Sequence, residues 1–452
     1  MSEAYSFDAD DILEAADIES DIPDGPFDAD DYADDLMGED AGPRARPSRE
    51  QDVAPTDQPV PRISIHAFCE LAETADLVTK AAGDRRLARA HVTVDMGGLS
   101  AAIETFHDTS TPNLVIVETG MRGQSLFKQL EHLASVCDAG THVIVIGAAN
   151  DIALYRELMR RGVSEYLVPP IDPVQLIRTI GGIYLDPEQP FAGRTLAFIG
   201  AKGGAGSSTI AHNIGWFIAE NAECDTTIVD LDLPFGTAGL DFNQDPVQGI
   251  ADALGQPDRV DDVLLDRLVA RCTERLSLLS APGTLDREWE IDTGAFETVL
   301  EVVRRSVPYV VLDLPHTWSR WVRETLLSAD DVVVTATPEL ASLRNAKNLF
   351  DLVRAHRPND PPPQIVLNMV GVPKRPEIPV KDFCEALGAE PCLVLPFEPT
   401  LFGEAANNGQ MLGEVSRDSR SIEGLEVLAR RLTGKDAPVQ SKSLFKRLLR
   451  KG

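Results

Sequence analysis

Residues 196–213, LAFIGAKGGAGSSTIAHN, carry the pattern that decides the fold of this 452-residue chain. The apolar run 196–199 predicts a buried parallel strand, the glycines within 200–206 predict a tight turn, and a helix is expected to open at Ser207. Glycines let a backbone approach an anion closely, and the free N–H groups of a helix start point at it. The stretch therefore predicts a phosphate-binding loop, with a glycine-rich turn that holds no ligand as the alternative.

This loop departs from the usual P-loop, Gly-x-x-x-x-Gly-Lys-[Ser/Thr], at two positions. When Gly206 is aligned with the second glycine, Ala201 takes the place of the first glycine and Ser207 that of the lysine. Ser208 then stands at the magnesium-ligand position, and a lysine occurs earlier, at Lys202. We expect the nucleotide contacts to come from Gly203, Gly204, Ala205, Gly206, Ser207, Ser208 and Thr209.

The order Lys-Gly-Gly-x-Gly-x-[Ser/Thr] at residues 202–208 resembles the deviant P-loop of the MinD/ParA family of dimerising ATPases. The resemblance implies an α/β nucleotide-binding fold, ATP and Mg²⁺ as cofactors, and a homodimer. It also implies that Lys202 is a catalytic residue that reaches the nucleotide of the partner. Because Ser207 supplies no cation to the β- and γ-phosphates, we expect slow ATP hydrolysis at most, which leaves the enzyme assignment open.

Acidic residues follow two further apolar runs. The segment 226–229 ends in Asp230 and Asp232, and the segment 308–312 ends in Asp313. In the family that the loop resembles, Asp232 matches the position that holds the attacking water, and Asp230 lies nearer the magnesium shell. Asp313 matches the Walker B carboxylate, which holds magnesium through water. The alternative is that these carboxylates only cap strand ends.

Two later positions are expected to border the adenine base. Asn368 lies in the apolar run 364–370, and Pro396 belongs to the loop 395–399. By resemblance, Asn368 contacts adenine, since an amide can pair with both the donor and the acceptor edge of the base. A strand-end cap is the alternative for Asn368.

Composition narrows the class of protein. The chain is 43% hydrophobic with a formal net charge of −30, and its six cysteines form no CxxC pair. An acidic protein is a poor nonspecific DNA binder, because DNA affinity rests on neutralising phosphates, so no nucleic-acid partner is expected. With no apolar run of about 20 residues and an acidic rather than signal-like N-terminus, we expect a cytoplasmic protein with reduced thiols.

Before the nucleotide domain, expected at 191–433, a region at 62–185 alternates apolar runs with amphipathic segments. Strands are predicted at 63–68, 91–94, 113–118, 142–147 and 166–168, and helices at about 70–82, 99–107, 124–137, 151–161 and 173–184. The pattern predicts a second doubly wound parallel sheet, so the fold class is α/β with two such domains. Residues 186–190 are the expected linker, and 1–61 an acidic, disordered arm or a segment that folds against a basic partner.

The region 62–185 resembles a response-regulator receiver domain without its chemistry. Receivers place an acidic pair after the first strand, an aspartate after the third and a lysine after the fifth. Here the first strand ends at Glu70, the third at Glu118, and Pro169 stands in the lysine position. We therefore expect no phosphorylation and predict a docking or dimerisation module, with a constitutive, phosphoaspartate-like charge at Glu118 as the alternative.

The segment 434–452 reverses the charge, with six Lys or Arg against Asp436. On a helical wheel its apolar residues share one face: Leu444, Phe445, Leu448 and Leu449. A basic amphipathic helix can lie on an anionic membrane surface, so peripheral contact with the inner membrane is one prediction. A packed helix or a docking peptide are the alternatives.

A receiver-like domain joined to a deviant P-loop ATPase resembles the CpaE/TadZ family of localisation ATPases of tight-adherence (Flp-type) pilus secretion systems. The resemblance covers about residues 62–433 and implies pilus secretion proteins, and a polar scaffold protein, as partners at a cell pole or membrane site. Two other functions remain open. One is a static nucleotide-bound scaffold without turnover, and the other is a ParA-type DNA partition ATPase.

Overall fold

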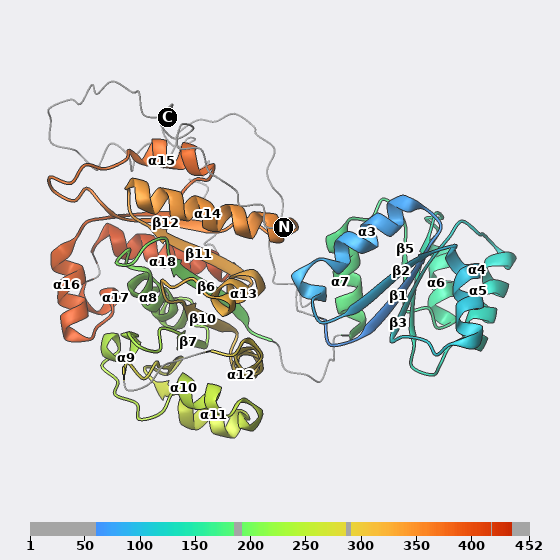
Figure 1. Ribbon diagram of the computed structural model, residues 1–452, viewed down its shortest axis with the longest axis horizontal. Helices are drawn as coiled ribbons and strands as arrows, with labels where there is room; N and C mark the ends of the chain where they lie inside the picture. Colours follow the sequence, from blue (N-terminus) through green and yellow to red (C-terminus); the bar gives the residue numbers. More distant parts are fainter. Residues whose placement is uncertain (1–59, 185–191, 286–290, 417, 436–452) are drawn as a thin grey trace, which may run out of the picture. The chain divides into compact units, whose positions relative to one another are not determined.

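The computed structural model describes residues 60–184, 192–285, 291–416 and 418–435 (Figure 1). The predicted linker 186–190 lies outside these residues, as do nearly all of the acidic arm and the apolar face of the C-terminal segment with Leu444, Phe445, Leu448 and Leu449. Within the described ranges, every helix is too short or too polar to cross a membrane.

The first unit, residues 60–184, is built on five parallel strands, as predicted. The strands are β1 (Ser64–Cys69), β2 (His91–Met96), β3 (Leu114–Thr119), β4 (His142–Gly147) and β5 (Glu165–Leu167), in the order β2-β1-β3-β4-β5. Between them lie α3 (Ala72–Ala82), the 3-10 turn η2 (Arg85–Leu87), α4 (Gly98–Asp108), α5 (Gln124–Val136), α6 (Ile152–Arg160) and α7 (Pro173–Tyr184). Each predicted helix and strand is present, with its ends shifted by at most two residues.

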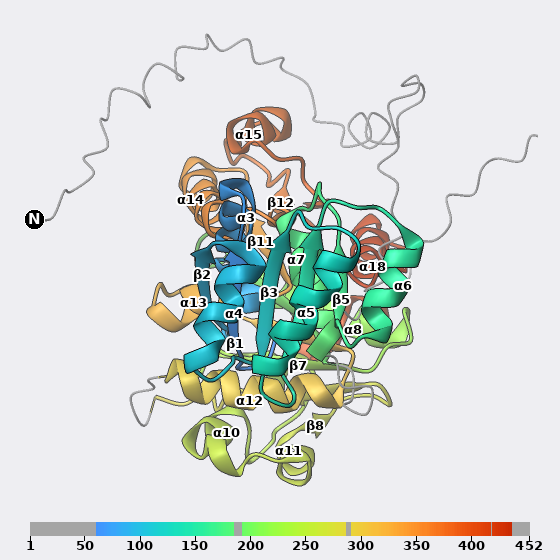
Figure 2. The same cartoon turned by 90° about the vertical axis from the view of Figure 1, so that its right-hand side faces the viewer.

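Helices cover both faces of this sheet, which explains why its strands β3 and β4 are near-continuous apolar runs. Leu114 and Ile116 of β3 pack in one apolar cluster with α3 and α7, while Val115 and Val117 pack in the other with α4, α5 and α6. In Figure 2, α4 and α5 lie on the near side of the sheet. The alternation follows from the two-residue period of a strand, which sends neighbouring side chains to opposite faces.

The second unit, residues 192–435, contains an eight-stranded sheet that includes the glycine loop. Its strands are β6 (Arg194–Gly200), β7 (Thr226–Asp230), β8 (Ala270–Arg271), β9 (Leu276–Leu279), β10 (Tyr309–Asp313), β11 (Asp331–Ala336), β12 (Gln364–Val370) and β13 (Leu393–Pro396). The order is β13-β12-β11-β6-β10-β7-β9-β8, and only β8 runs antiparallel to its neighbour. The described part of the chain therefore confirms the predicted α/β class, with two sheets that are parallel apart from this edge strand.

Two helical layers cover the larger sheet (Figure 1). One contains α10 (Ile250–Gly255), η3 (Pro257–Arg259), α11 (Asp262–Leu268), α12 (Thr293–Ser306), α13 (Arg320–Ser328), α14 (Leu340–His356) and α15 (Val380–Leu387). The other contains α8 (Ser207–Glu220), α9 (Ala238–Asp241), α16 (Pro399–Asn408), α17 (Leu412–Val415) and α18 (Arg420–Leu432). Gly215 lets α8 lie close to β7, since a Cβ there would be 2.7 Å from Ile228 Cδ1.

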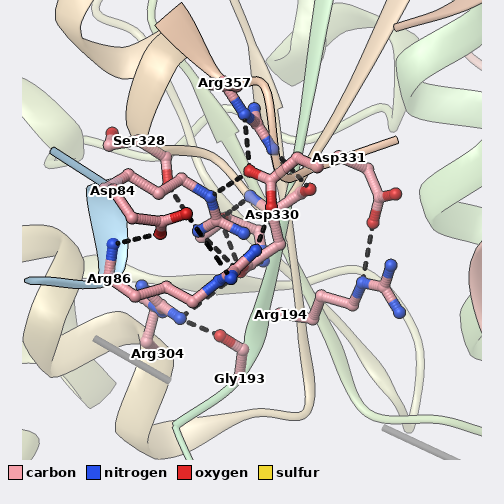
Figure 3. A network of polar contacts seen from close by, with 12 residues as sticks. Asp84, Arg86, Gly193, Arg194, Arg304, Ser328, Asp330, Asp331 and Arg357 are labelled. Atoms are coloured by element: carbon pink, nitrogen blue, oxygen red, sulfur yellow. Dashed lines mark hydrogen bonds and ion pairs between the residues drawn. The ribbon is translucent and has the colours of Figure 1, made fainter. Parts of the chain in front are cut away.

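Charged side chains gather where the strands of the larger sheet begin (Figure 3). Arg194 at the start of β6 pairs with Asp331 at 2.7 Å, and Arg304 lies 3.3 Å from Asp330. Arg304 Nε also donates to the carbonyl of Gly193 at 2.8 Å. These pairs fix the amino end of the sheet, whereas the glycine loop leaves β6 at the opposite, carboxyl end. The functional groups of a parallel sheet collect at that carboxyl end.

Candidate functional site

The glycine loop joins the carboxyl end of β6 to the start of α8. Gly206 caps α8 with φ of 87°, a left-handed conformation that favours glycine. A Cβ at Gly206 would also lie only 2.5 Å from Asn368 Nδ2, so the loop needs glycine here for two separate reasons. The helix begins at Ser207, as predicted, and its first-turn N–H groups have no acceptor within the helix, which makes them available to an anion.

The two buried carboxylates predicted near magnesium lie side by side. Asp230 ends β7 and Asp313 ends β10, and these neighbouring strands pair the two residues directly in register. Both side chains are buried. Burial and the negative charge of Asp313 raise the pKa of Asp230 to about 7. Two buried carboxylates paired in register repel each other, so a positive charge beside them, from a side chain or a bound cation, stabilises the pair.

Asp230 and Asp232 differ in their surroundings. The carboxylate of Asp230 accepts hydrogen bonds from the backbone N–H groups of Asp232 and Ala238, both at 3.1 Å, and so anchors the loop that follows β7. Asp232 lies beyond the end of the strand and is only partly buried, and burial raises its pKa. The predicted water-holding position is therefore on a loop that is tied to the predicted magnesium-side carboxylate.

A histidine that the sequence reasoning missed completes this cluster. His212 of α8 is fully buried, with Nδ1 2.7 Å from Asp241 Oδ2 and Nε2 3.2 Å from Asp313 Oδ2. Burial opposes the charged imidazolium, but the hydrogen bonds and charges of Asp241 and Asp313 outweigh it and raise the pKa of His212 to about 10. A histidine among apolar residues of the helix after the glycine loop was the available sequence signal.

Lys202 reaches from the loop to another segment of the same chain. Its Nζ pairs with Glu339, the residue that precedes α14, and both side chains are about one-third exposed. Glu339 also accepts a hydrogen bond from Thr337 Oγ1 at 2.5 Å, and the hydrogen bond from Lys202 lowers the pKa of Glu339. Asn345 of α14 further braces the loop, donating to the carbonyl of Ala201 at 2.9 Å.

Asn368 is buried against the loop. Its Nδ2 donates to the carbonyl of Ala205 at 2.9 Å, and its Oδ1 accepts from the N–H of Met369 at 2.9 Å. An amide has one further donor and one further acceptor, so these bonds leave the predicted adenine contact untested. Pro396 is the last residue of β13. This strand lies next to β12, which contains Asn368.

At this site, Ser207 Oγ and Asp313 Oδ1 are buried without a hydrogen-bond partner among the described residues, whereas His212 Nε2 is paired by charge with Asp313 Oδ2. Each buried polar atom without a partner costs about 1–3 kcal/mol. Carboxylate and hydroxyl oxygens are what Mg²⁺ prefers, and phosphate oxygens accept from hydroxyl and N–H donors. The residues present therefore fit a nucleotide bound with magnesium at this loop.

In the first unit, Glu118 at the end of β3 is bound to the segment after β1. Its carboxylate accepts from Glu70 N at 2.7 Å, Leu71 N at 2.8 Å and Thr74 Oγ1 at 2.6 Å. Glu70 in turn accepts from Gly120 N at 2.9 Å. Burial, with the charge of Glu118, raises the pKa of the neighbouring Cys69 thiol to about 11. The position where a receiver carries its phosphoacceptor thus holds a carboxylate that the surrounding loop already uses.

Comparisons with known proteins give matches to both units of the chain. No protein-family model matches the chain. Septum site-determining protein MinD of Synechocystis sp. is 25% identical over 264 residues, 54% of this chain and 91% of MinD. The glycine loop, the parallel sheet and this identity place the chain among the ATPases of the MinD/ParA superfamily.

Two solved structures match the receiver-like region. The pilus assembly protein CpaE of Caulobacter crescentus is 56% identical, with 29% of this chain and 99% of that chain covered and a TM-score of 0.28. A CpaE2 pilus assembly protein of Sinorhizobium meliloti is 42% identical, with 27% and 99% covered and a TM-score of 0.27. The similarity to CpaE pilus assembly proteins is therefore one of sequence and extends over the receiver-like region of this chain.

Proposed function

We propose that the glycine loop binds Mg–ATP. The observation that carries the proposal is the adjacent placement of Asp230 and Asp313, with Asp313 Oδ1 and Ser207 Oγ buried and unpartnered among the described residues. Residues 203–209 would bind the phosphates, Ser208, Asp230 and Asp313 would lie on the magnesium side, and Asn368 and Pro396 would border adenine. Bound Mg²⁺ would neutralise charge on the β- and γ-phosphates.

The second part of the proposal is an ATP-dependent homodimer with slow or impaired hydrolysis. Lys202 is held at the surface of the loop by Glu339, one-third exposed, and is therefore accessible to a second subunit. Asp232 would orient the attacking water and accept its proton. Ser207 stands where the usual lysine would stabilise transferred charge, which supports slow turnover and keeps the static nucleotide-bound scaffold as the second candidate.

We further propose that residues 62–185 and 191–433 act as separate modules of a localisation factor for a tight-adherence pilus secretion system. The first module would dock pilus secretion proteins or a polar scaffold protein, and the second would gate that docking by dimerisation. The bonds of Glu118 to the loop after β1 support a docking module that works without phosphorylation. A DNA partition role is disfavoured by the net charge of −30.

The test compares ATP binding and phosphate release over a range of protein concentrations for the wild type, Lys202→Ala and a control, Lys347→Ala. Lys347 is an exposed lysine of α14. Turnover that rises faster than linearly with concentration, is lost in Lys202→Ala and persists in Lys347→Ala supports a cycling dimer. Tight Mg–ATP binding without turnover selects the static scaffold. No binding at all refutes the nucleotide assignment.

A further inference from the structure

His212 connects two elements that are distant in sequence. Its position on α8 places one ring nitrogen against Asp241 of α9 and the other against Asp313 of β10, at 2.7 and 3.2 Å. The ring is fully buried, so water does not satisfy either nitrogen. With carboxylates on both sides, the side chain acts as a bridge between the predicted magnesium-side carboxylate and α9.

The helix α9 and the residue before it, Thr237, are held in place by Asp241 and by the carboxylate pair Asp230 and Asp313. Asp241 also accepts from Thr237 Oγ1 at 3.3 Å, which holds the start of α9 to its end. Asp230 accepts from the N–H of Ala238, the first residue of α9. One end of α9 is therefore fixed by Asp230 directly, and the other end is fixed by Asp313 through His212.

Two exposed apolar side chains lie in this segment. Phe235 is 68% exposed and Leu240 is 73% exposed. Between them, Gly236 lies so close to Asp230 that a Cβ would be 2.3 Å from Oδ2. The segment 232–243 therefore lies tightly over the carboxylate pair on one side and presents apolar surface to solvent on the other.

We propose that His212 is a positioning residue that couples occupancy of the Asp230–Asp313 pair to the conformation of segment 232–243. This inference rests on the proposed function, since the occupant is magnesium bound with nucleotide. A cation at Asp313 competes with His212 Nε2 for the same carboxylate, since Nε2 lies 3.2 Å from Asp313 Oδ2 and both need that carboxylate as their partner. Occupancy therefore weakens one end of the bridge that holds α9, and by linkage α9 influences magnesium binding to the same extent.

The experiment is hydrogen–deuterium exchange of the peptide 237–243 in the full chain. The wild type, His212→Gln and Asp241→Asn are measured without ligand, with ATP and EDTA, and with ATP and Mg²⁺. The control Asp245→Asn removes an exposed carboxylate from the same loop region without touching His212. We expect the wild type and the control to change exchange when Mg²⁺ is added to ATP, and both bridge variants to lose that change.

Without ligand, both bridge variants should exchange about tenfold faster in this peptide, as expected when one charge-assisted hydrogen bond is lost. Asp241→Asn alters only the partly exposed end of the bridge, where the Asp241 side chain is 20% exposed, so it carries the test if His212→Gln does not fold. A Mg²⁺-dependent change that survives in Asp241→Asn overturns the coupling. A wild type that binds Mg–ATP but shows no such change also overturns it, whereas a wild type that does not bind nucleotide refutes the proposed function itself.

Discussion

The substitution Gly206→Ala tests the geometry of the glycine loop. Gly206 has φ of 87°, and a left-handed backbone costs a non-glycine residue about 1–2 kcal/mol. The added Cβ would lie 2.5 Å from Asn368 Nδ2, which donates to the carbonyl of Ala205. Asn368 must move away, and breaking this buried hydrogen bond costs about 1–3 kcal/mol more.

These contributions sum to about 2–5 kcal/mol of lost stability, which corresponds to a fall in Tm of roughly 5–15 °C for a unit of this size. Thermal unfolding of the full chain, followed by circular dichroism, measures it. The matched control is Gly255→Ala, at the exposed end of α10, where no heavy atom lies within 4 Å of the new Cβ and φ is not positive. We expect this control to change Tm little.

A second measurement separates the strain from the lost hydrogen bond. In the double variant Gly206→Ala with Asn368→Ala, the clash is gone, and the buried hydrogen bond that each single variant loses is lost only once. The two single costs should therefore sum to more than the cost of the double variant. If Gly206→Ala has the Tm of the wild type, or if the two substitutions are additive, the loop is not packed against Asn368 and the reasoning fails.

Three further predictions follow from the buried and surface carboxylates. Glu118→Ala should destabilise the first unit by about 1–3 kcal/mol, because the N–H groups of Glu70 and Leu71 lose their acceptor. An unchanged thermal midpoint would contradict this loss of stability. Acetyl phosphate should label neither the wild type nor the variant. Because the pKa of Asp230 is about 7 in the folded chain and near 4 in the unfolded chain, the folded state binds more protons between these pH values. The contribution of Asp230 to the free energy of unfolding therefore falls as pH rises from about 4 to 7. Relative to the wild type, Asp230→Asn should thus gain in Tm from pH 5 to pH 8, and parallel profiles would refute the assignment. Glu339→Gln removes the charge that pairs with Lys202. Because this pair is partly exposed, Tm should stay unchanged. Because Lys202 is then released toward a second subunit, the protein concentration at which dimers form in ultracentrifugation should fall.

Features that depend on residues close in the sequence were predicted, whereas features that depend on contacts between distant segments were not. The five strands of the first unit follow from apolar runs of three to six residues, which are most continuous in the central strand β3, because a strand buried on both faces needs no polar positions. No element was predicted within 238–306, where the structure has α9, α10, η3, α11, β8 and β9, each of seven residues or fewer, and the 14-residue α12, whose amphipathic pattern the prediction missed. Short or edge elements contribute few periodic positions, and packing against the sheet decides their form instead.

The expectation that Asp230 and Asp313 both lie near magnesium followed from the sequence by resemblance to the MinD/ParA family, and β7 and β10 pair the two residues in register. The partners of individual side chains did not follow from the sequence. His212 meets Asp241 and Asp313, Lys202 meets Glu339, and Asn368 meets Ala205, across separations that no local pattern encodes.

The sequence by itself thus determined the class of fold, the glycine loop and the carboxylates at the strand ends, because each depends on local conformation or strand periodicity. Only the tertiary structure decided that a buried histidine lies between Asp313 and α9, and that Glu118 is bound to the loop after β1. The reason is that a buried polar group takes its partners from whatever elements the packed sheet brings within hydrogen-bond distance.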